Sequence, residues 1–204
     1  MTTSDSEFLA RYEQLGRFFM GTSDVHVALA RVAQKLEELQ IPYAICGGMA
    51  VNAHGLRRGT EDVDVLLTPE GLAKFKANAL GLGWLEKFPG SRGVRDTQNR
   101  VQIDILVTGG IPGDGTPHGV VFPDPAAVAI EHAGTKYVSL ATLIEMKLAS
   151  GLSTTHRPRD FDDVIRLIRV NRLGEHFGDA MHLFVRAKYA ECWRAAQIDD
   201  PEQD

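Results

Sequence analysis

Hydrophobic residues recur at intervals of three and four between residues 23 and 40, at Val25, Leu29, Val32, Leu36 and Leu39. This period is that of an amphipathic helix, and Ser23 or Asp24 can cap its first turn. The pattern then changes, because residues 41–46 form a short continuous apolar run that a Gly-Gly pair interrupts. A run of this kind predicts a short buried strand that ends at a tight turn.

Strand and helix patterns alternate along the middle of the chain and give way to helices toward its end. Before residue 139 the predicted elements are a short helix at 49–55, a strand at 61–68, a helix at 69–83, a hairpin over 94–109 and a strand at 136–140. Beyond it we predict helices at 139–151 and 157–171 and a helical remainder to about residue 197. These elements predict an α/β (α+β) fold, with a mixed-sheet core over residues 1–138 and a helical C-terminal region over 139–204 packed on it.

The composition, with 44% hydrophobic and 24% charged residues among 204, is that of an ordinary globular protein. No run of about 18 apolar residues occurs and the N-terminus is too polar for a signal peptide, so we expect a cytoplasmic protein with no membrane partner. Cys46 and Cys192 are too few for a disulfide framework or a Cys-rich metal site. The formal net charge of −5 argues against nonspecific coating of nucleic acid but is compatible with a local basic patch.

Two aspartates interrupt the apolar strand predicted at residues 61–68. Side chains alternate across a strand, so Asp62 and Asp64 share one face while the residues between them face the core. Asp104 stands in the same relation to its neighbours in the second strand of the predicted hairpin. If these strands adjoin, three carboxylates converge, and such hard oxygen ligands suit Mg²⁺ (or Mn²⁺) completed by phosphate oxygens. The alternative is a solvated polar face, which the repulsion of like charges on one face of a strand disfavours.

Gly47 and Gly48 lie between a predicted strand and a predicted helix. Backbone N–H groups at such a turn can bind an anion, and side chains larger than hydrogen would keep a triphosphate away from that backbone. A Gly-Gly pair alone often marks only a tight turn. Its combination with two aspartates on the next strand and a third on a later strand favours a phosphate site.

Together these features resemble the polymerase-β-like nucleotidyltransferases, in which a Gly-Gly/Ser helix start precedes an hDhD strand and a later carboxylate strand. Residues 57–67, RRGTEDVDVLL, are similar to the R-x-T-x-D-[hydrophobic]-D stretch of the minimal bacterial members. The segments SLATLIEMKLASG and RPRDFDDVIRL resemble the "LlalKlaa…R-x-R-D-x-x-D" stretch of the AbiEii-type toxin nucleotidyltransferases. The resemblance covers about residues 30–170.

The resemblance implies a role for each matching residue. Asp62 and Asp64 would bind the metals, and Asp104 would bind one metal and help to deprotonate the acceptor hydroxyl. The remaining matches, which would hold the nucleoside triphosphate or stand beside the aspartates, are Gly47, Gly48, Arg58, Thr60, Lys147 and Asp160. Three of these have simpler alternatives from the sequence alone. Lys147 could be a solvated helix lysine, Asp160 a cap or a partner of a nearby arginine, and Arg58 a partner of Glu61.

The implied activity is transfer of a nucleoside monophosphate from an NTP to a hydroxyl acceptor, with release of pyrophosphate. The toxin resemblance, together with an arginine-rich segment over residues 157–172, favours RNA and in particular a tRNA end as acceptor, with a cognate antitoxin as a possible partner. A small-molecule acceptor of the antibiotic type, or a protein acceptor, is the first alternative. A catalytically silent nucleotide- or RNA-binding module is the second, and the sequence leaves the oligomeric state open.

Overall fold

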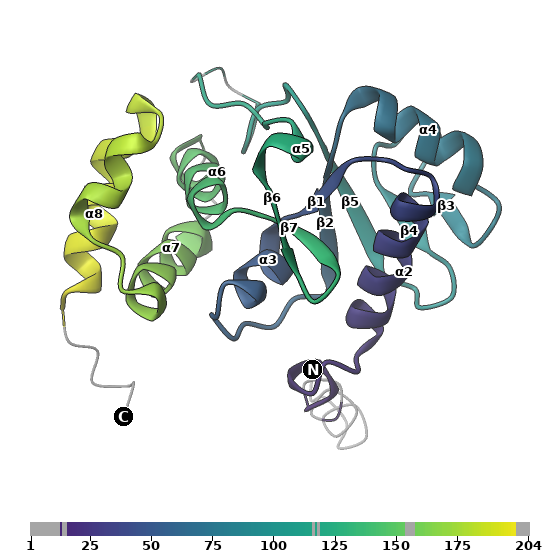
Figure 1. The fold of residues 1–204 in the computed structure, drawn as a ribbon, viewed down its shortest axis with the longest axis horizontal. Helices are drawn as coiled ribbons and strands as arrows, with labels where there is room; N and C mark the ends of the chain where they lie inside the picture. Colours follow the sequence, from purple (N-terminus) through teal and green to yellow (C-terminus); the bar gives the residue numbers. More distant parts are fainter. Residues whose placement is uncertain (1–12, 14–15, 116, 118, 154–157, 199–204) are drawn as a thin grey trace, which may run out of the picture.

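The computed structural model describes residues 13, 16–115, 117, 119–153 and 158–198. Its centre is one seven-stranded sheet with the order β3-β4-β5-β2-β1-β7-β6 (Figure 1). The strands are β1 (Tyr43–Ile45), β2 (Asp62–Leu67), β3 (Trp84–Glu86), β4 (Val94–Asp96), β5 (Gln102–Val107), β6 (Ala129–His132) and β7 (Thr135–Val138). The pairs β2–β5 and β1–β7 are parallel and the other four are antiparallel, so the predicted mixed sheet is confirmed.

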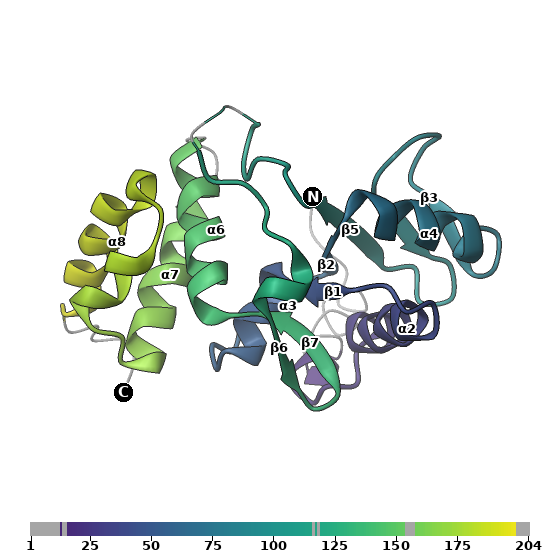
Figure 2. The same ribbon diagram turned by 45° about the horizontal axis from the view of Figure 1, so that its top comes forward.

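Helices cover both faces of the sheet. On one face α2 (Asp24–Glu38) and α4 (Pro69–Ala79) bury apolar side chains against Val63, Val65 and Leu67 of β2. The opposite face carries α3 (Gly47–Ala53), α6 (Leu140–Ser153), α7 (Pro158–Asn171) and α8 (Leu183–Ala196), whose core includes Leu66. Figure 2 shows α6, α7 and α8 packed beside one another at one end of the molecule. A short helix α5 (Pro125–Val128) and a 3-10 turn η1 (Glu175–Ala180) complete the fold.

The alternation of acidic and apolar residues in 61–68 corresponds to the two faces of the sheet, each of which is covered by a different set of helices. The odd-numbered residues of β2 are fully buried beneath α2 and α4, whereas Asp62 and Asp64 lie on the face of α3 and α6 and are half-buried. Thr68 caps α4 by accepting a hydrogen bond from the backbone N–H of Gly71 at 3.0 Å, and Pro69 opens that helix as predicted.

The helix predicted over residues 69–83 is too long, because α4 ends at Ala79. Gly81 and Gly83 have φ angles of +79° and +95°, which a continuing right-handed helix excludes, and the chain turns there into β3. Strands β3 and β6 and helix α5 were not predicted. Each has only three or four residues, too few for a period to show in the sequence.

Among the residues that the structure describes, no helix combines the length and the apolar character needed to cross a membrane. The division into residues 1–138 and 139–204 stays a prediction. Helices α6 to α8 share one continuous core with α3 and with Ala44 and Cys46 at the end of β1.

Candidate active site

The turn at Gly47 brings the start of α3 against the carboxylate of Asp64. Gly47 has a φ angle of +56°, in the left-handed region that residues with a Cβ adopt only at a cost. A Cβ atom at this position would lie 1.7 Å from Oδ2 of Asp64. Both the backbone conformation and the close approach therefore require glycine at position 47.

Gly48 allows a second close approach, between α3 and the loop that leads into β2. A Cβ atom there would lie 2.7 Å from Thr60 Cβ and 3.2 Å from Arg58 Nη1. Asn52, on the next turn of α3, donates from Nδ2 to the carbonyl oxygens of Gly48 (2.8 Å) and Arg58 (2.6 Å), and its Oδ1 accepts from the Arg58 backbone N–H at 3.0 Å. Asn52 thus fixes the loop that carries Arg58 and Thr60, a role that the sequence analysis missed.

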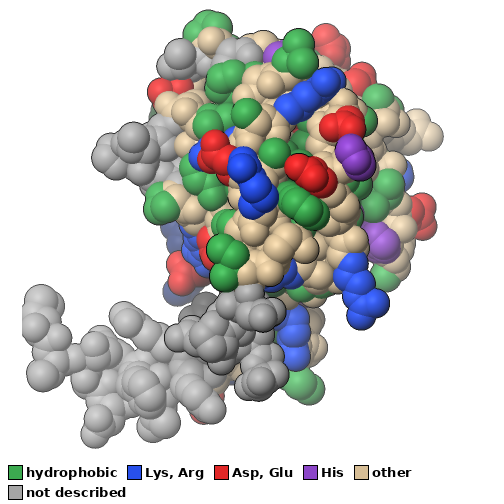
Figure 3. All heavy atoms as spheres, turned by 90° about the vertical axis from the view of Figure 1, so that its left-hand side faces the viewer, with side chains coloured by type: hydrophobic (Ala, Val, Ile, Leu, Met, Phe, Trp, Pro, Cys, Tyr) green, Lys and Arg blue, Asp and Glu red, His purple; other side chains and the backbone are tan. Residues whose placement is uncertain are grey.

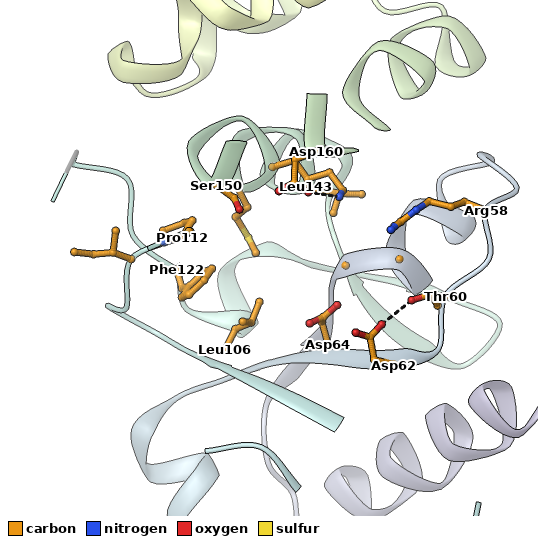
Figure 4. A pocket seen from close by; sticks show the side chains of 16 residues that line it. Arg58, Thr60, Asp62, Asp64, Leu106, Pro112, Phe122, Leu143, Ser150 and Asp160 are labelled. Carbon is orange, nitrogen blue, oxygen red and sulfur yellow. Dashed lines mark hydrogen bonds and ion pairs between the residues drawn. The ribbon is translucent and has the colours of Figure 1, made fainter. Parts of the chain in front are cut away.

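Asp62 and Asp64 project from β2 toward the same space as the start of α3 (Figure 4). Thr60 Oγ1 donates a hydrogen bond of 2.6 Å to Asp62 Oδ1, which orients that carboxylate. Asp64 also influences the fully buried Cys46. Burial, and then the neighbouring Asp64 carboxylate, raise the pKa of the Cys46 thiol, so this cysteine stays protonated near neutral pH.

Asp104 lies on the strand beside Asp64 and on the same face of the sheet. Strands β2 and β5 are parallel neighbours, and the register pairs Asp64 with Asp104. The Asp104 carboxylate, however, accepts a hydrogen bond from Gln102 Nε2 at 3.0 Å, and its Oδ1 lies on the side of Gly93, away from the cavity lining. Over residues 16–115, 119–153 and 158–198 the structure gathers no three His, Cys, Asp or Glu side chains tightly enough to hold a metal ion. The predicted strand arrangement is found, whereas the convergence of all three carboxylates is not.

Helices α6 and α7 contribute a buried ionic cluster opposite the aspartates. Lys147, only 8% exposed, donates from Nζ to Asp160 Oδ1 at 3.0 Å and to Asp163 Oδ2 at 2.7 Å. Arg58 Nη1 approaches the same Asp163 oxygen at 3.3 Å. Lys147 is thus a buried lysine rather than a solvated one. Among the described residues Asp160 pairs with Lys147, and Arg58 pairs with Asp163.

In this cluster two buried polar atoms, Asp163 Oδ1 and Arg58 Nε, have no hydrogen-bond partner among the residues that the structure describes. Each such atom costs about 1–3 kcal/mol of stability. Local strain or unmet polar groups of this kind concentrate at functional sites. Asp163 was not singled out from the sequence. The available signal was the last aspartate of the R-x-R-D-x-x-D match, whose first aspartate is Asp160.

The aspartates, the glycine turn and the ionic cluster line one cavity of about 310 Å³, a size suited to a small ligand. The lining includes eight predicted site residues, Gly47, Gly48, Arg58, Thr60, Asp62, Asp64, Lys147 and Asp160. Figure 4 shows Leu106, Pro112 and Phe122, with Ser150 above them, on the side of the cavity away from Arg58 and Thr60; Ile111 and Met146 add further apolar surface to the lining. The cavity therefore offers a charged end and an apolar end to a single ligand.

The donor atoms at the charged end fit a divalent cation. Asp62 and Asp64 supply hard carboxylate oxygens at the cavity wall, and Mg²⁺ is commonly held by one or two carboxylates with the remaining ligands from water and substrate phosphates. Asp104 is in register with Asp64 on a strand about 4.8 Å away, so rotation of its side chain would bring a third carboxylate to the pair.

Two arginines of the segment predicted to contact RNA donate hydrogen bonds to backbone carbonyls of the protein itself. Arg169 donates from Nε to the Ala196 carbonyl at 3.0 Å and from Nη2 to the Ala195 and Ile198 carbonyls at 3.2 and 2.9 Å, which caps the end of α8. Arg159 donates to the Gly59 carbonyl at 3.4 Å, and Arg157 lies outside the described residues. Figure 3 shows scattered acidic and basic side chains, without a continuous basic surface, on the face that it presents.

Arg169→Gln should lower the free energy of unfolding by about 1–2 kcal/mol, because it removes a cation that caps a helix C-terminus. Arg166 provides the matched control on the same helix, since the one ion pair that it makes with a described residue is with the exposed Asp162 at 3.9 Å. Arg166→Gln should change that free energy by less than about 0.5 kcal/mol. Urea denaturation of the two variants makes the comparison, and equal stabilities would contradict the capping role of Arg169.

The chain matches no protein-family model and no curated protein sequence. Solved structures are similar to it in fold. The crystal structure of ANT(2'')-Ia, a nucleotidyltransferase, in complex with adenylyl-2''-tobramycin covers 81% of this chain and 96% of its own, with 14% identity and a TM-score of 0.54. The solution structure of the antibiotic-resistance factor ANT(2'')-Ia covers 83% and 93%, with 17% identity and a TM-score of 0.52.

A nucleotidyltransferase-like protein from Paracoccidioides brasiliensis is similar over 71% of this chain and 75% of its own, at 18% identity. Its TM-score of 0.43 is too low to add to the fold assignment. The AbiEii-type proteins are not among these structures. The likeness to ANT(2'')-Ia extends over nearly the whole of that chain, and this protein therefore shares the fold of ANT(2'')-Ia.

Proposed function

We propose that the protein transfers a nucleoside monophosphate from an NTP to a hydroxyl acceptor and releases pyrophosphate. The observation that carries this proposal is the single cavity that holds two strand aspartates, a close glycine turn and two cationic side chains. Carboxylates that bind a divalent cation and cations that bind phosphate are the two requirements of phosphoryl transfer. The fold shared with ANT(2'')-Ia supports the same reaction class.

In this proposal the residues of the chain position two substrates. Lys147 and Arg58 hold phosphate oxygens of the NTP in the cavity that Gly47 and Gly48 also line. Asp62 and Asp64 would hold Mg²⁺ or Mn²⁺, which when bound neutralises the charge that develops on the phosphate oxygens. Asp104, rotated toward Asp64, would accept the proton of the acceptor hydroxyl.

The bonds exchanged are simple. The acceptor oxygen forms a bond to the α-phosphorus while the bond between that phosphorus and the pyrophosphate oxygen breaks. The hydroxyl proton passes to Asp104, and pyrophosphate leaves past Lys147 and Arg58. No covalent intermediate with the protein is needed, since orientation and charge stabilisation supply the rate.

The acceptor that we propose is RNA, as in toxin–antitoxin systems. The support for this acceptor is the sequence resemblance to AbiEii-type toxins. The arginines of α7 add little support, because Arg169 caps α8 and Arg166 pairs with Asp162. A small hydroxyl compound is the second candidate. It is favoured by the fold neighbour ANT(2'')-Ia, which is bound to an adenylylated antibiotic and is covered almost completely by this chain.

Incubation of the purified protein with each labelled NTP, Mg²⁺ and either total RNA or a panel of small hydroxyl compounds tests the proposal. Transfer to RNA should fall steeply with salt, because a protein that contacts RNA phosphates displaces counterions from them. Labelling of a small compound in the absence of RNA would instead establish the second candidate. Absence of labelling on every acceptor would contradict nucleotidyl transfer itself.

Lys147→Met should raise KM for the NTP by about 10- to 100-fold, which corresponds to the loss of one charged hydrogen bond to phosphate. Methionine keeps the length of the buried stem while removing the ammonium group. Lys74, exposed on α4 across the sheet, provides a control of equal charge change. Steady-state kinetics of both variants checks this, and a KM for Lys147→Met equal to that of Lys74→Met would remove Lys147 from the phosphate site.

A further inference from the structure

Asp163 joins two cations that come from distant parts of the chain. It lies on α7 and is 1% exposed, whereas Lys147 lies on α6 and Arg58 lies in the loop before β2. A single oxygen, Oδ2, is 2.7 Å from Lys147 Nζ and 3.3 Å from Arg58 Nη1. Asp163 itself is not part of the cavity lining, but both cations are. The carboxylate therefore lies behind the two positive groups as seen from the cavity.

The contacts of Lys147 leave part of its ammonium group for a ligand in the cavity. An ammonium group has three N–H donors, and Lys147 uses two of them on Asp163 and Asp160. Within the described part of the chain the third donor has no partner, and Lys147 lines the cavity, so this donor can bind a ligand there. Of its ion pairs with described residues, Lys147 would keep without Asp163 the one to Asp160 at the cavity wall. Arg58 would lose the one ion pair that it makes within this part of the chain.

We propose that Asp163 is a positioning residue that holds Lys147 and Arg58 side by side at the cavity wall, where both contact the phosphates of the nucleotide. This inference rests on the proposed function and adds to it the element that aligns the two cations. Asp163 touches neither substrate. Its effect on transfer passes entirely through Lys147 and Arg58.

A purely structural role is the competing account, since Asp163 also ties α7 to α6. The two accounts predict different effects of Asp163 on transfer once Lys147 and Arg58 have been replaced. A residue that acts through Lys147 and Arg58 has no further effect on transfer once both are replaced, whereas a residue that maintains the fold lowers transfer in either background. The comparison therefore needs Asp163→Asn in the wild type and in a Lys147→Met/Arg58→Met background.

Asp163→Asn keeps the shape of the side chain and removes its charge. In the wild-type background we expect kcat/KM for the NTP to fall about 10- to 100-fold, mainly through KM, the range found when a group that orients a binding residue is removed. In the Lys147→Met/Arg58→Met background the same change should alter the residual kcat/KM by less than about 2-fold. Asp162→Asn, an equal charge change at the neighbouring exposed position, should leave the wild-type kinetics unaltered.

A further 10-fold loss in the double-variant background would overturn the inference, because Asp163 would then act by another route. Wild-type kinetics in Asp163→Asn would also overturn it and leave nucleotidyl transfer intact. Failure of the wild-type protein to transfer any nucleotide would instead remove the proposed function on which the inference rests. If Asp163→Asn does not fold by circular dichroism, Asp163→Glu keeps the negative charge, displaces the oxygen and is judged by the same two comparisons.

Discussion

Asp64→Asn should reduce nucleotide transfer by a factor of at least about 10², the loss typical of removing one group that stabilises charge in a transition state. The Asp64 carboxylate lies against Gly47 and beside Asp62, where it can bind the cation that bridges to the phosphates. Asparagine has the same shape but binds Mg²⁺ poorly, since it lacks the negative charge. The assay is transfer of label from an NTP in the presence of Mg²⁺.

The same variant should keep its fold. Asp62 and Asp64 share one face of β2, so removing one negative charge relieves repulsion in the metal-free protein. We expect the melting temperature of Asp64→Asn without Mg²⁺ to equal or exceed that of the wild type, and the stabilisation of the wild type by Mg²⁺ with NTP to disappear in the variant. Near-normal transfer by Asp64→Asn, or an unchanged shift of melting temperature, would place the cation elsewhere.

Gly47→Ala should reduce transfer by a similar factor and also destabilise the protein. The alanine Cβ would collide with Oδ2 of Asp64 and force that carboxylate out of the cavity wall. In addition, a non-glycine residue at a φ angle of +56° costs about 1–3 kcal/mol. Transfer assays and urea denaturation of the variant measure the two effects separately.

Gly90→Ala separates the backbone cost from the collision. Gly90 lies between β3 and β4, has a φ angle of +80°, and a Cβ atom there would meet no atom within 4 Å. We expect Gly90→Ala to lose a comparable amount of stability and to transfer nucleotide at the wild-type rate. Equal transfer by Gly47→Ala and Gly90→Ala would show that the contact between Gly47 and Asp64 has no part in the reaction.

The sequence predicted the main elements because their apolar positions have a clear period. The alternation in β2 places Asp62 and Asp64 on the face opposite Val63 and Val65, and the structure has the same arrangement. Helix α4 was predicted to be too long because Leu80 and Leu82 continue an apolar pattern. The positive φ angles of Gly81 and Gly83 that end it are a backbone property that such a pattern does not contain.

The candidate site was predicted less completely than the fold. Eight predicted residues line the cavity, but the side-chain direction of Asp104 depends on Gln102 and on the space beside Gly93, contacts that strand alternation does not reveal. Asp163 was missed for a related reason. Its importance lies in its pairing with Arg58, which is 105 positions earlier in the chain and is brought to it only by the packing of α7 against the loop before β2.

The position of the transferred phosphorus tests the central claim most directly. The wild-type protein and Asp64→Asn are incubated with Mg²⁺, total RNA or small hydroxyl compounds, and an NTP labelled either at the α-phosphate or at the γ-phosphate. Nucleotidyl transfer predicts that the wild type places only the α-label on an acceptor and releases the γ-label as pyrophosphate, while Asp64→Asn does neither. Transfer of the γ-label to an acceptor, or no transfer of either label by the folded wild-type protein, would contradict the account.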